Sequence, residues 1–181
     1  DTAARTMTVN VTAVNDAPTI TSLSGDALIY PAASGAVVID QGSAASVADV
    51  DSADFSTGTL TVSFAAGSDS AEDVLAIRNQ GSGAGQIGVS GANVTYAGTT
   101  IGTWTGGSGG ADLVITLNAS ANPTNAAALL QNITYEDTDV ASPTGAQRTV
   151  RFVLTDGDGG TSASYDATLA VASVGTPYMI S

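Results

Sequence analysis

The sequence contains no cysteine, no histidine and no lysine among its 181 residues. These absences exclude disulfides, zinc or iron sites with nitrogen and sulfur ligands, Schiff-base chemistry, and nucleophiles activated by an imidazole. Any bound metal must therefore be held by oxygen, from carboxylates, side-chain amides, backbone carbonyls or water. Hard cations take such ligands, and among them we expect Ca²⁺.

Basic residues are also scarce. Four arginines stand against 17 Asp and Glu residues, which gives a formal net charge of −13 at pH 7. Nucleic acids and anionic membranes are bound by basic surfaces, so neither is an expected partner. No run of about 18 apolar residues is present, and the opening DTAARTMTVN does not resemble a signal peptide, so no membrane insertion is expected. A start at Asp rather than Met is typical of an internal fragment of a longer protein.

Apolar and polar residues alternate in many short stretches, which is the pattern of half-buried strands. The clearest examples are residues 6–14, 60–64, 113–117, 150–154 and 165–171. Shorter candidates are residues 36–40, 73–78, 86–89, 93–97, 100–104 and 132–136. Glycine-rich turns, such as GSGAG and GGSGG, separate several of these stretches.

One segment predicts a helix. Asn122 suits the N-cap position, Pro123 suits the first helical position, and the helical pattern continues to Leu130. About ten strands with one short helix predict an all-β fold, an antiparallel Ig/cadherin-like β-sandwich.

The two ends of the sequence resemble each other. Residues 1–21 match residues 161–181, with Val9 opposite Leu169 and Ile20 opposite Ile180. We therefore expect three parts: the last strand of a preceding repeat plus a linker in 1–18, a complete repeat in 19–174, and the start of a next repeat in 175–181. Whole domains repeated through short junctions are typical of stalks and filaments.

The densest acidic cluster is Asp49-Val-Asp51-Ser-Ala-Asp54, just before the strand near residues 59–65. Alternate carboxylates in an irregular loop can converge on one cation, and their mutual repulsion favours a cation among them. A solvated turn is the alternative, because Asp and Ser are common turn residues.

Three further segments carry candidate ligands. DGDGG at 156–160 has the spacing of a tight calcium turn or of an Asp-Gly hairpin. EDTD at 136–139 could face the same end of the sandwich, and the junction NDAP at 15–18 could share an ion between modules. The candidate metal ligands are Asn15, Asp16, Asp49, Asp51, Asp54, Glu136, Asp137, Asp139, Asp156 and Asp158. The remaining acids are expected to be solvated: Asp26, Asp40, Asp69, Glu72, Asp73, Asp112 and Asp166.

Several segments carry a resemblance when taken together: VNVTAVNDAPTIT, ADVDSADFSTGTLTVSF, ALLQNITYEDTD and RTVRFVLTDGDGGTS. They resemble the cadherin-like repeats of giant bacterial surface proteins. These repeats occur in RTX-type adhesins and are similar to those of chondroitin-sulfate-proteoglycan cores. The resemblance covers nearly the whole chain.

The resemblance implies an extracellular, cell-surface sandwich module with calcium at its junctions and a role in adhesion or surface extension. Its motifs fall on residues already singled out: Asn15 and Asp16, then Asp49, Asp51 and Asp54, then Asp156 and Asp158. The junction at 175–177 reads Gly-Thr-Pro and lacks a carboxylate, so the resemblance does not imply a calcium site there.

The leading hypothesis is a calcium-stiffened spacer whose partners are neighbouring repeats of the same protein. The alternative is a filament subunit, in which the strand over 6–14 pairs with another copy of the chain. An enzyme is not expected, because the acids lie in polar, glycine-rich loops and not in an apolar cleft. Trp104 is expected in the core, and few aromatics remain for binding sugars.

Overall fold

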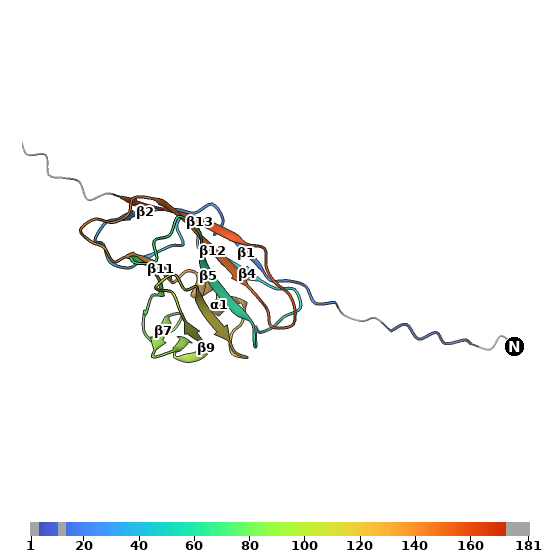
Figure 1. Cartoon of the computed structure of the whole chain (residues 1–181). Coiled ribbons are helices and arrows are strands. Elements are labelled where there is room, and N and C mark those ends of the chain that lie inside the picture. The colour runs from blue at the N-terminus through green and yellow to red at the C-terminus, as the bar shows by residue number, and fades with distance from the viewer. Residues whose placement is uncertain (1–3, 11–13, 173–181) are drawn as a thin grey trace, which may run out of the picture.

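The computed structural model describes residues 4–10 and 14–172 (Figure 1). Within these residues the chain forms thirteen strands and one helix, so the fold is all-β and sandwich-like, as the alternation predicts. The elements are β1 (Thr19–Thr21), β2 (Ala27–Pro31), β3 (Val37–Val38), β4 (Ser46–Ala48), β5 (Thr59–Ala66), β6 (Asp73–Ile77), β7 (Ile87–Ser90), β8 (Asn93–Tyr96), β9 (Thr99–Thr105), β10 (Leu113–Leu117), α1 (Pro123–Leu130), β11 (Ile133–Asp137), β12 (Gln147–Leu154) and β13 (Tyr165–Ala172).

The strands form three sheets. The largest has eight strands in the order β2-β13-β12-β5-β10-β9-β8-β7, the second has the order β3-β11-β6, and β1 pairs with β4. Every pair is antiparallel except β2 and β13, which run parallel. The predicted antiparallel sandwich therefore contains one parallel pair, at this edge of the largest sheet. Parallel pairing is possible here because β2 and β13 are far apart in sequence, so no hairpin turn fixes their relative direction.

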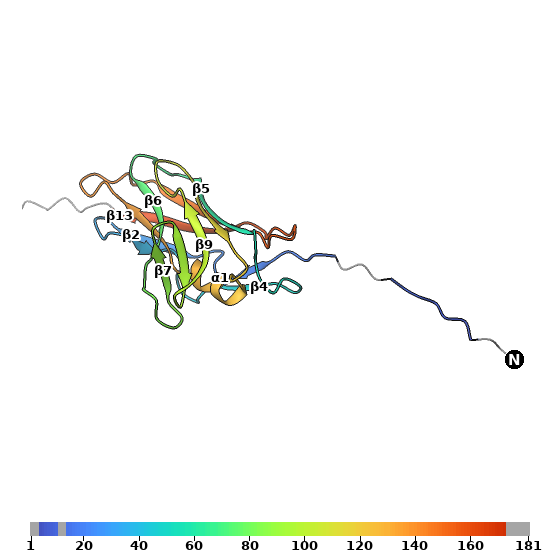
Figure 2. The same ribbon diagram turned by 90° about the horizontal axis from the view of Figure 1, so that it is seen from below.

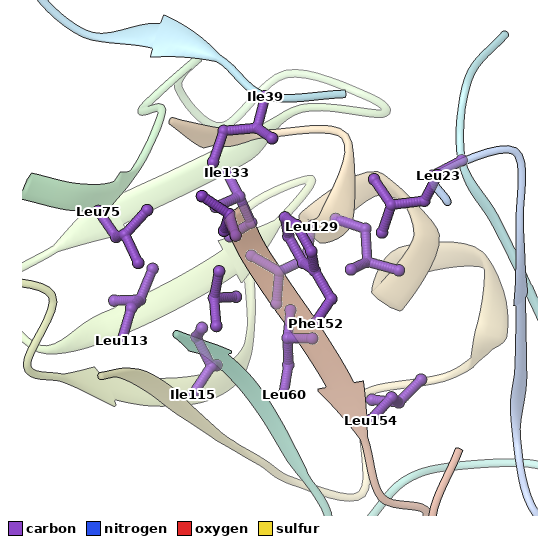
Figure 3. Packing of buried hydrophobic residues seen from close by; sticks show 14 of the residues in the cluster. Leu23, Ile39, Leu60, Leu75, Leu113, Ile115, Leu129, Ile133, Phe152 and Leu154 are labelled. Atoms are coloured by element: carbon purple, nitrogen blue, oxygen red, sulfur yellow. The ribbon is translucent and has the colours of Figure 1, made fainter. Parts of the chain in front are cut away.

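Strand β12 shows how the alternation builds the core. Val150, Phe152 and Leu154 are buried, while the residues between them are partly exposed. These three buried residues belong to the same buried apolar cluster as Leu129 from α1 and Ile133 from β11, and Figure 3 shows Phe152 beside Leu129. Burial of one such apolar side chain contributes about 1.5–3 kcal/mol. The core therefore fixes which face of β12 points inward.

The helix α1 begins as the sequence predicts. Asn122 accepts a hydrogen bond from the Asn125 amide, and the Asn125 side chain accepts one from the Asn122 amide, which forms a reciprocal cap. Leu129 and Leu130 are buried, and the helix lies beside β4 (Figure 2). In the part of the chain that the structure describes, no helix has the length and apolar character needed to cross a membrane.

The chain reaches the domain at one end, and β13 finishes at the other (Figure 1). We call the end where residues 14–18 meet the loops 49–58 and 155–161 the linker pole. The opposite end, formed by residues 67–73 and 137–148, is the distal pole. Strand β12 spans the two, because Gln147 at its start pairs with Ala170 near the end of β13.

Residues 6–10 form no strand, so the prediction of a strand over 6–14 is wrong for this described part. Met7 and Val9 are 82% and 68% exposed. No strand among the described residues pairs with residues 6–10, and their unpaired backbone groups can bind water instead. Residues 11–13 of that strand, and the junction at 175–177, lie outside the described residues.

Candidate functional site

At the linker pole, the structure joins two of the predicted motifs. Asn15 donates a hydrogen bond from Nδ2 to Oδ2 of Asp156 over 2.7 Å. The other oxygen of Asp156 accepts from the amides of Asp158 and Gly160 at 2.8 and 2.9 Å. Asp156 is fully buried, so this contact fixes the linker against the 156–160 loop.

These hydrogen bonds decide the charge of Asp156. Burial alone would raise the pKa of its carboxyl group, but the bonds from Asn15 and from the backbone amides outweigh burial. The pKa of Asp156 is therefore lowered below its ordinary value. A negative charge is held at the base of the linker.

The 49–54 loop makes a second contact with the linker. The Asp16 amide donates to both carboxylate oxygens of Asp51, each at 3.2 Å. Asp49 Oδ1 accepts from the amides of Asp51 and Ser52, and Asp54 Oδ1 accepts from Ser56. These are turns closed by Asp side chains. Asp49 Oδ2 is buried and has no hydrogen-bond partner.

The two loops at this pole pack directly against each other. The Thr59 amide donates to Thr155 Oγ1 over 2.7 Å, at the point where both loops join the sheet. Gly157 has a φ of +92° and lies so close to Ser56 that a Cβ atom would overlap the Ser56 carbonyl oxygen. Glycine is therefore required for this approach.

The potential metal-ligand atoms of the acids at the linker pole are of the type that a hard cation binds. All are oxygens, one buried carboxylate oxygen of Asp49 lacks a partner, and no ion pair among the described residues involves these acids. Their carboxylates do not meet as a group of three within 4.8 Å in the described part of the chain. The predicted residues are thus brought to one pole in two contacts, Asn15 with Asp156 and Asp16 with Asp51, and do not form a complete coordination shell.

The EDTD segment lies elsewhere. Asp137 ends β11 at the distal pole, and Asp137 pairs in register with Asp73 of β6. The expectation that Glu136, Asp137 and Asp139 share a pole with Asp156 is wrong. Strand β12 follows this segment and carries the chain across the domain before Asp156 is reached, so the two motifs lie at opposite ends.

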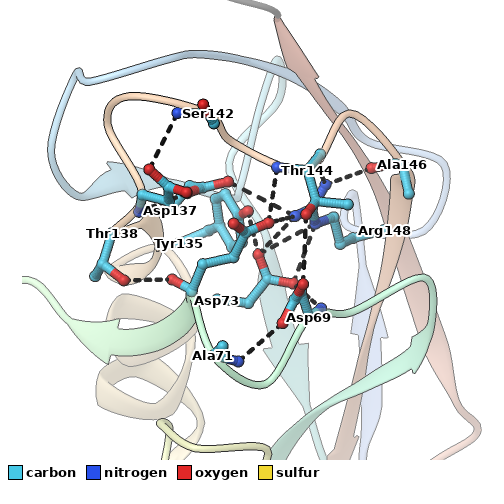
Figure 4. A network of polar contacts seen from close by, with 12 residues as sticks. Asp69, Ala71, Asp73, Tyr135, Asp137, Thr138, Ser142, Thr144, Ala146 and Arg148 are labelled. Atoms are coloured by element: carbon cyan, nitrogen blue, oxygen red, sulfur yellow. Dashed lines mark hydrogen bonds and ion pairs between the residues drawn. The ribbon is translucent and has the colours of Figure 1, made fainter.

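A buried ionic group occupies the distal pole (Figure 4). Arg148 Nη2 lies 3.0 Å from Glu72 Oε1, 3.0 Å from Asp73 Oδ1 and 3.6 Å from Asp137 Oδ2. The guanidinium group is fully buried. Tyr135 donates its hydroxyl to Asp73 Oδ1 over 2.5 Å. Three acids, one arginine and one tyrosine thus form a single network.

The environment shifts the pKa values of this network. Burial raises the pKa of Asp137, and the charge of Glu72 adds to the effect, while the amide of Asp139 opposes it. Burial and the bond to Asp73 raise the pKa of Tyr135. Burial alone would lower the pKa of Arg148, but its carboxylate partners raise it, so the arginine stays charged.

The solvated positions predicted for Glu72 and Asp73 are wrong, since both are buried against Arg148. The sequence carries one signal that charged residues are buried here. Arg148 is two residues before Val150 and so lies in phase with the buried face of β12. A charge at a core position indicates a buried partner of opposite sign.

Other acids also differ from the expectation of simple solvation. Asp166 is paired with Arg151 at 2.7 Å, and this lowers the pKa of its carboxyl group. Asp40 is half-buried with one unpartnered oxygen, and burial together with the charge of Asp26 raises its pKa. Trp104 packs partly buried against the core, and its indole N–H donates to the Gly91 carbonyl over 3.2 Å.

Comparison of the chain with protein-family models, with curated proteins and with solved structures found no match.

Proposed function

We propose that this chain is a calcium-binding extracellular module that acts as a structural or adhesive spacer between neighbouring repeats of a large bacterial surface protein. One observation carries the proposal: the linker is held at an acidic pole by Asn15 on Asp156 and by Asp16 on Asp51. Calcium bound there acts on the joint between modules and not only on the domain itself.

Charge supports calcium at this pole. Six carboxylates gather there, on residues Asp16, Asp49, Asp51, Asp54, Asp156 and Asp158. None of them has an ion-pair partner among the described residues. Like charges at short range repel, and a divalent cation replaces repulsion with attraction. Asp49 Oδ2 has no hydrogen-bond partner and is therefore available to coordinate such an ion.

Calcium at this pole would restrict the linker. Asn15 makes one hydrogen bond to Asp156, and the exposed Asp16 amide shares its proton between the two oxygens of Asp51, so each contact contributes only about 1–3 kcal/mol. An ion that binds the same loops would hold the loops in the conformation that makes these contacts. The linker then meets the domain at a fixed angle, as a rod of repeats requires.

The lowered pKa of Asp156 argues for ligation and against acid catalysis. A general acid needs a carboxyl group whose pKa is raised so that a proton is held near neutral pH. Asp156 has the opposite shift. We therefore propose no catalytic role for this pole.

Thermal unfolding with calcium and with chelator tests the proposal. At a free Ca²⁺ concentration about 100-fold above the dissociation constant, one site adds about 2.7 kcal/mol to stability, and the melting temperature rises. Asp49→Asn should reduce the rise, because it removes the charge of the unpartnered carboxylate. Asp112→Asn, at an exposed acid away from the linker, serves as the matched control. Equal melting temperatures in calcium and in chelator would reject calcium binding.

A filament subunit assembled by strand pairing is the second candidate. Met7 and Val9 favour it, because both are exposed on residues that form no strand in this chain. A neighbouring copy could offer a free sheet edge to them, such as β7 or β2. If so, light scattering at rising concentration should show association in the full chain and none after deletion of residues 1–14. A monomer in both cases would remove this candidate.

A further inference from the structure

We propose a second divalent-cation site at the distal pole, formed by Glu72, Asp73 and Asp137. It rests on the proposed calcium-binding function for the choice of ion, but it uses no residue of the linker pole. Each of the three residues offers one carboxylate oxygen, and these oxygens all lie within 4.8 Å of one another. All three residues are buried.

The first argument is charge. Three carboxylates carry −3 and Arg148 carries +1, so the buried group has a formal charge of −2. Uncompensated charge in a buried site is costly. Among the described residues only Arg148 forms ion pairs with these acids, since Arg78 is exposed and donates to Asn132, and Arg151 is partly exposed and pairs with Asp166. The sequence has no lysine or histidine to help.

The second argument is the hydrogen bonding of Arg148, which has five N–H groups to donate. Nε donates to Asp73, and Nη1 donates to the carbonyls of Thr144 and Ala146. Nη2 donates to Glu72 and to Asp73. All five groups are thereby used, and Asp137 receives none of them.

Asp137 Oδ2 therefore receives no hydrogen bond from Arg148. It faces the group at 3.6 Å from Arg148 Nη2, the Asp137 side chain is 1% exposed, and this oxygen has no hydrogen-bond partner. A buried carboxylate oxygen without a donor needs a cation or a proton. One carboxylate oxygen from each of Glu72, Asp73 and Asp137 lies within 4.8 Å of the others, and such a set of oxygens is the ligand type that hard divalent ions take.

Binding there would tie distant segments together. Asp73 begins β6, Asp137 ends β11, and Glu72 accepts a hydrogen bond from the Thr144 amide in the loop that leads to β12. One ion would connect all three segments at the end of the domain where β13 finishes. Both poles would then respond to calcium, each through its own residues.

Terbium luminescence tests this site directly, because Tb³⁺ takes the same oxygen ligands as Ca²⁺ and is excited by a nearby tyrosine. Tyr135 donates to Asp73 and so is the local antenna. We expect tyrosine-sensitised emission that saturates with Tb³⁺ and is displaced by CaCl₂. Asp137→Asn should weaken Tb³⁺ binding by about tenfold or more, since ligand charge sets affinity. Asp49→Asn at the linker pole should leave this signal unchanged.

Two further variants keep the test decisive. Tyr135→Phe should abolish the sensitised emission while calorimetry with CaCl₂ still detects the ion. Glu72→Gln replaces Asp137→Asn if circular dichroism shows that the latter is unfolded. Emission that is absent, or unchanged in the folded Asp137 or Glu72 variant, would overturn the site. The proposed function fails separately, if the calcium-dependent rise in melting temperature is unaffected by Asp49→Asn.

Discussion

Replacement of Arg148 by methionine should destabilise the domain by about 3–5 kcal/mol, the cost of removing one partner from a buried ionic group. The variant leaves the three buried acids Glu72, Asp73 and Asp137 without the guanidinium group that they share. The carbonyl groups of Thr144 and Ala146 also lose the hydrogen bonds that Arg148 donates to them. Urea unfolding at neutral pH measures the loss. The loss should shrink at mildly acid pH, because the buried Asp137 carboxyl group, whose pKa is raised by burial, then takes up a proton.

Arg151→Met is the matched control on the same strand. Arg151 pairs with Asp166 over 2.7 Å, but their side chains are 42% and 36% exposed. Exposed ion pairs contribute about 0–1 kcal/mol. Equal losses from the two methionine variants would show that the buried group does not stabilise β12 in the way the geometry indicates.

Gly157→Ala should have the second large effect, a loss of about 2–4 kcal/mol from overpacking and from a disfavoured backbone conformation. A Cβ atom there would overlap the Ser56 carbonyl oxygen and lie 2.8 Å from the Gly58 amide nitrogen. The loops 49–58 and 155–161 would have to separate. Because both loops belong to the linker pole, the rise in melting temperature that we propose for calcium should also be smaller in this variant.

Gly25→Ala separates the cost of the disfavoured backbone conformation from the cost of overpacking. Gly25 has a φ of +89°, close to the +92° of Gly157, but no atom lies within 4 Å of the position that an alanine methyl group would take. Its substitution should cost only the backbone contribution, about 1–2 kcal/mol, and should leave the response to calcium unchanged. If Gly25→Ala and Gly157→Ala are alike in both measurements, the contact between the loops has no role in calcium binding.

Much of the fold can be predicted because its signals are local. The core strands β5, β10, β12 and β13 follow from strict alternation, and α1 follows from its cap and proline. Strand β2 does not follow from the sequence in this way. Its burial alternates, but an apolar residue, Ile29, takes an exposed position, so apolar and polar residue types do not alternate in its sequence. Its pairing with β13 also depends on residues about 140 positions away.

The candidate sites show the same limit. Within each loop of the linker pole the acids are neighbours in sequence, so the sequence predicts the clusters at 49–54 and 156–158, but the contacts of Asn15 with Asp156 and of Asp16 with Asp51 form only across the fold. The distal group is not predicted, because Arg148 meets Glu72 and Asp73 only across the fold, at a separation of 75 residues or more. Sequence shows charges in clusters, whereas burial and pairing depend on which strands the fold brings side by side.

In the proposed spacer, the parallel edge pair would have a mechanical consequence. Within the described residues the chain reaches β2 from the linker and leaves the sheet at the end of β13, so a pull on these two ends would drag the two strands past each other in opposite directions. Their five residue pairs, from Thr168 with Ala27 to Ala172 with Pro31, would then be loaded in shear at the same time. They would not separate one after another, as they would if the two strands were peeled apart.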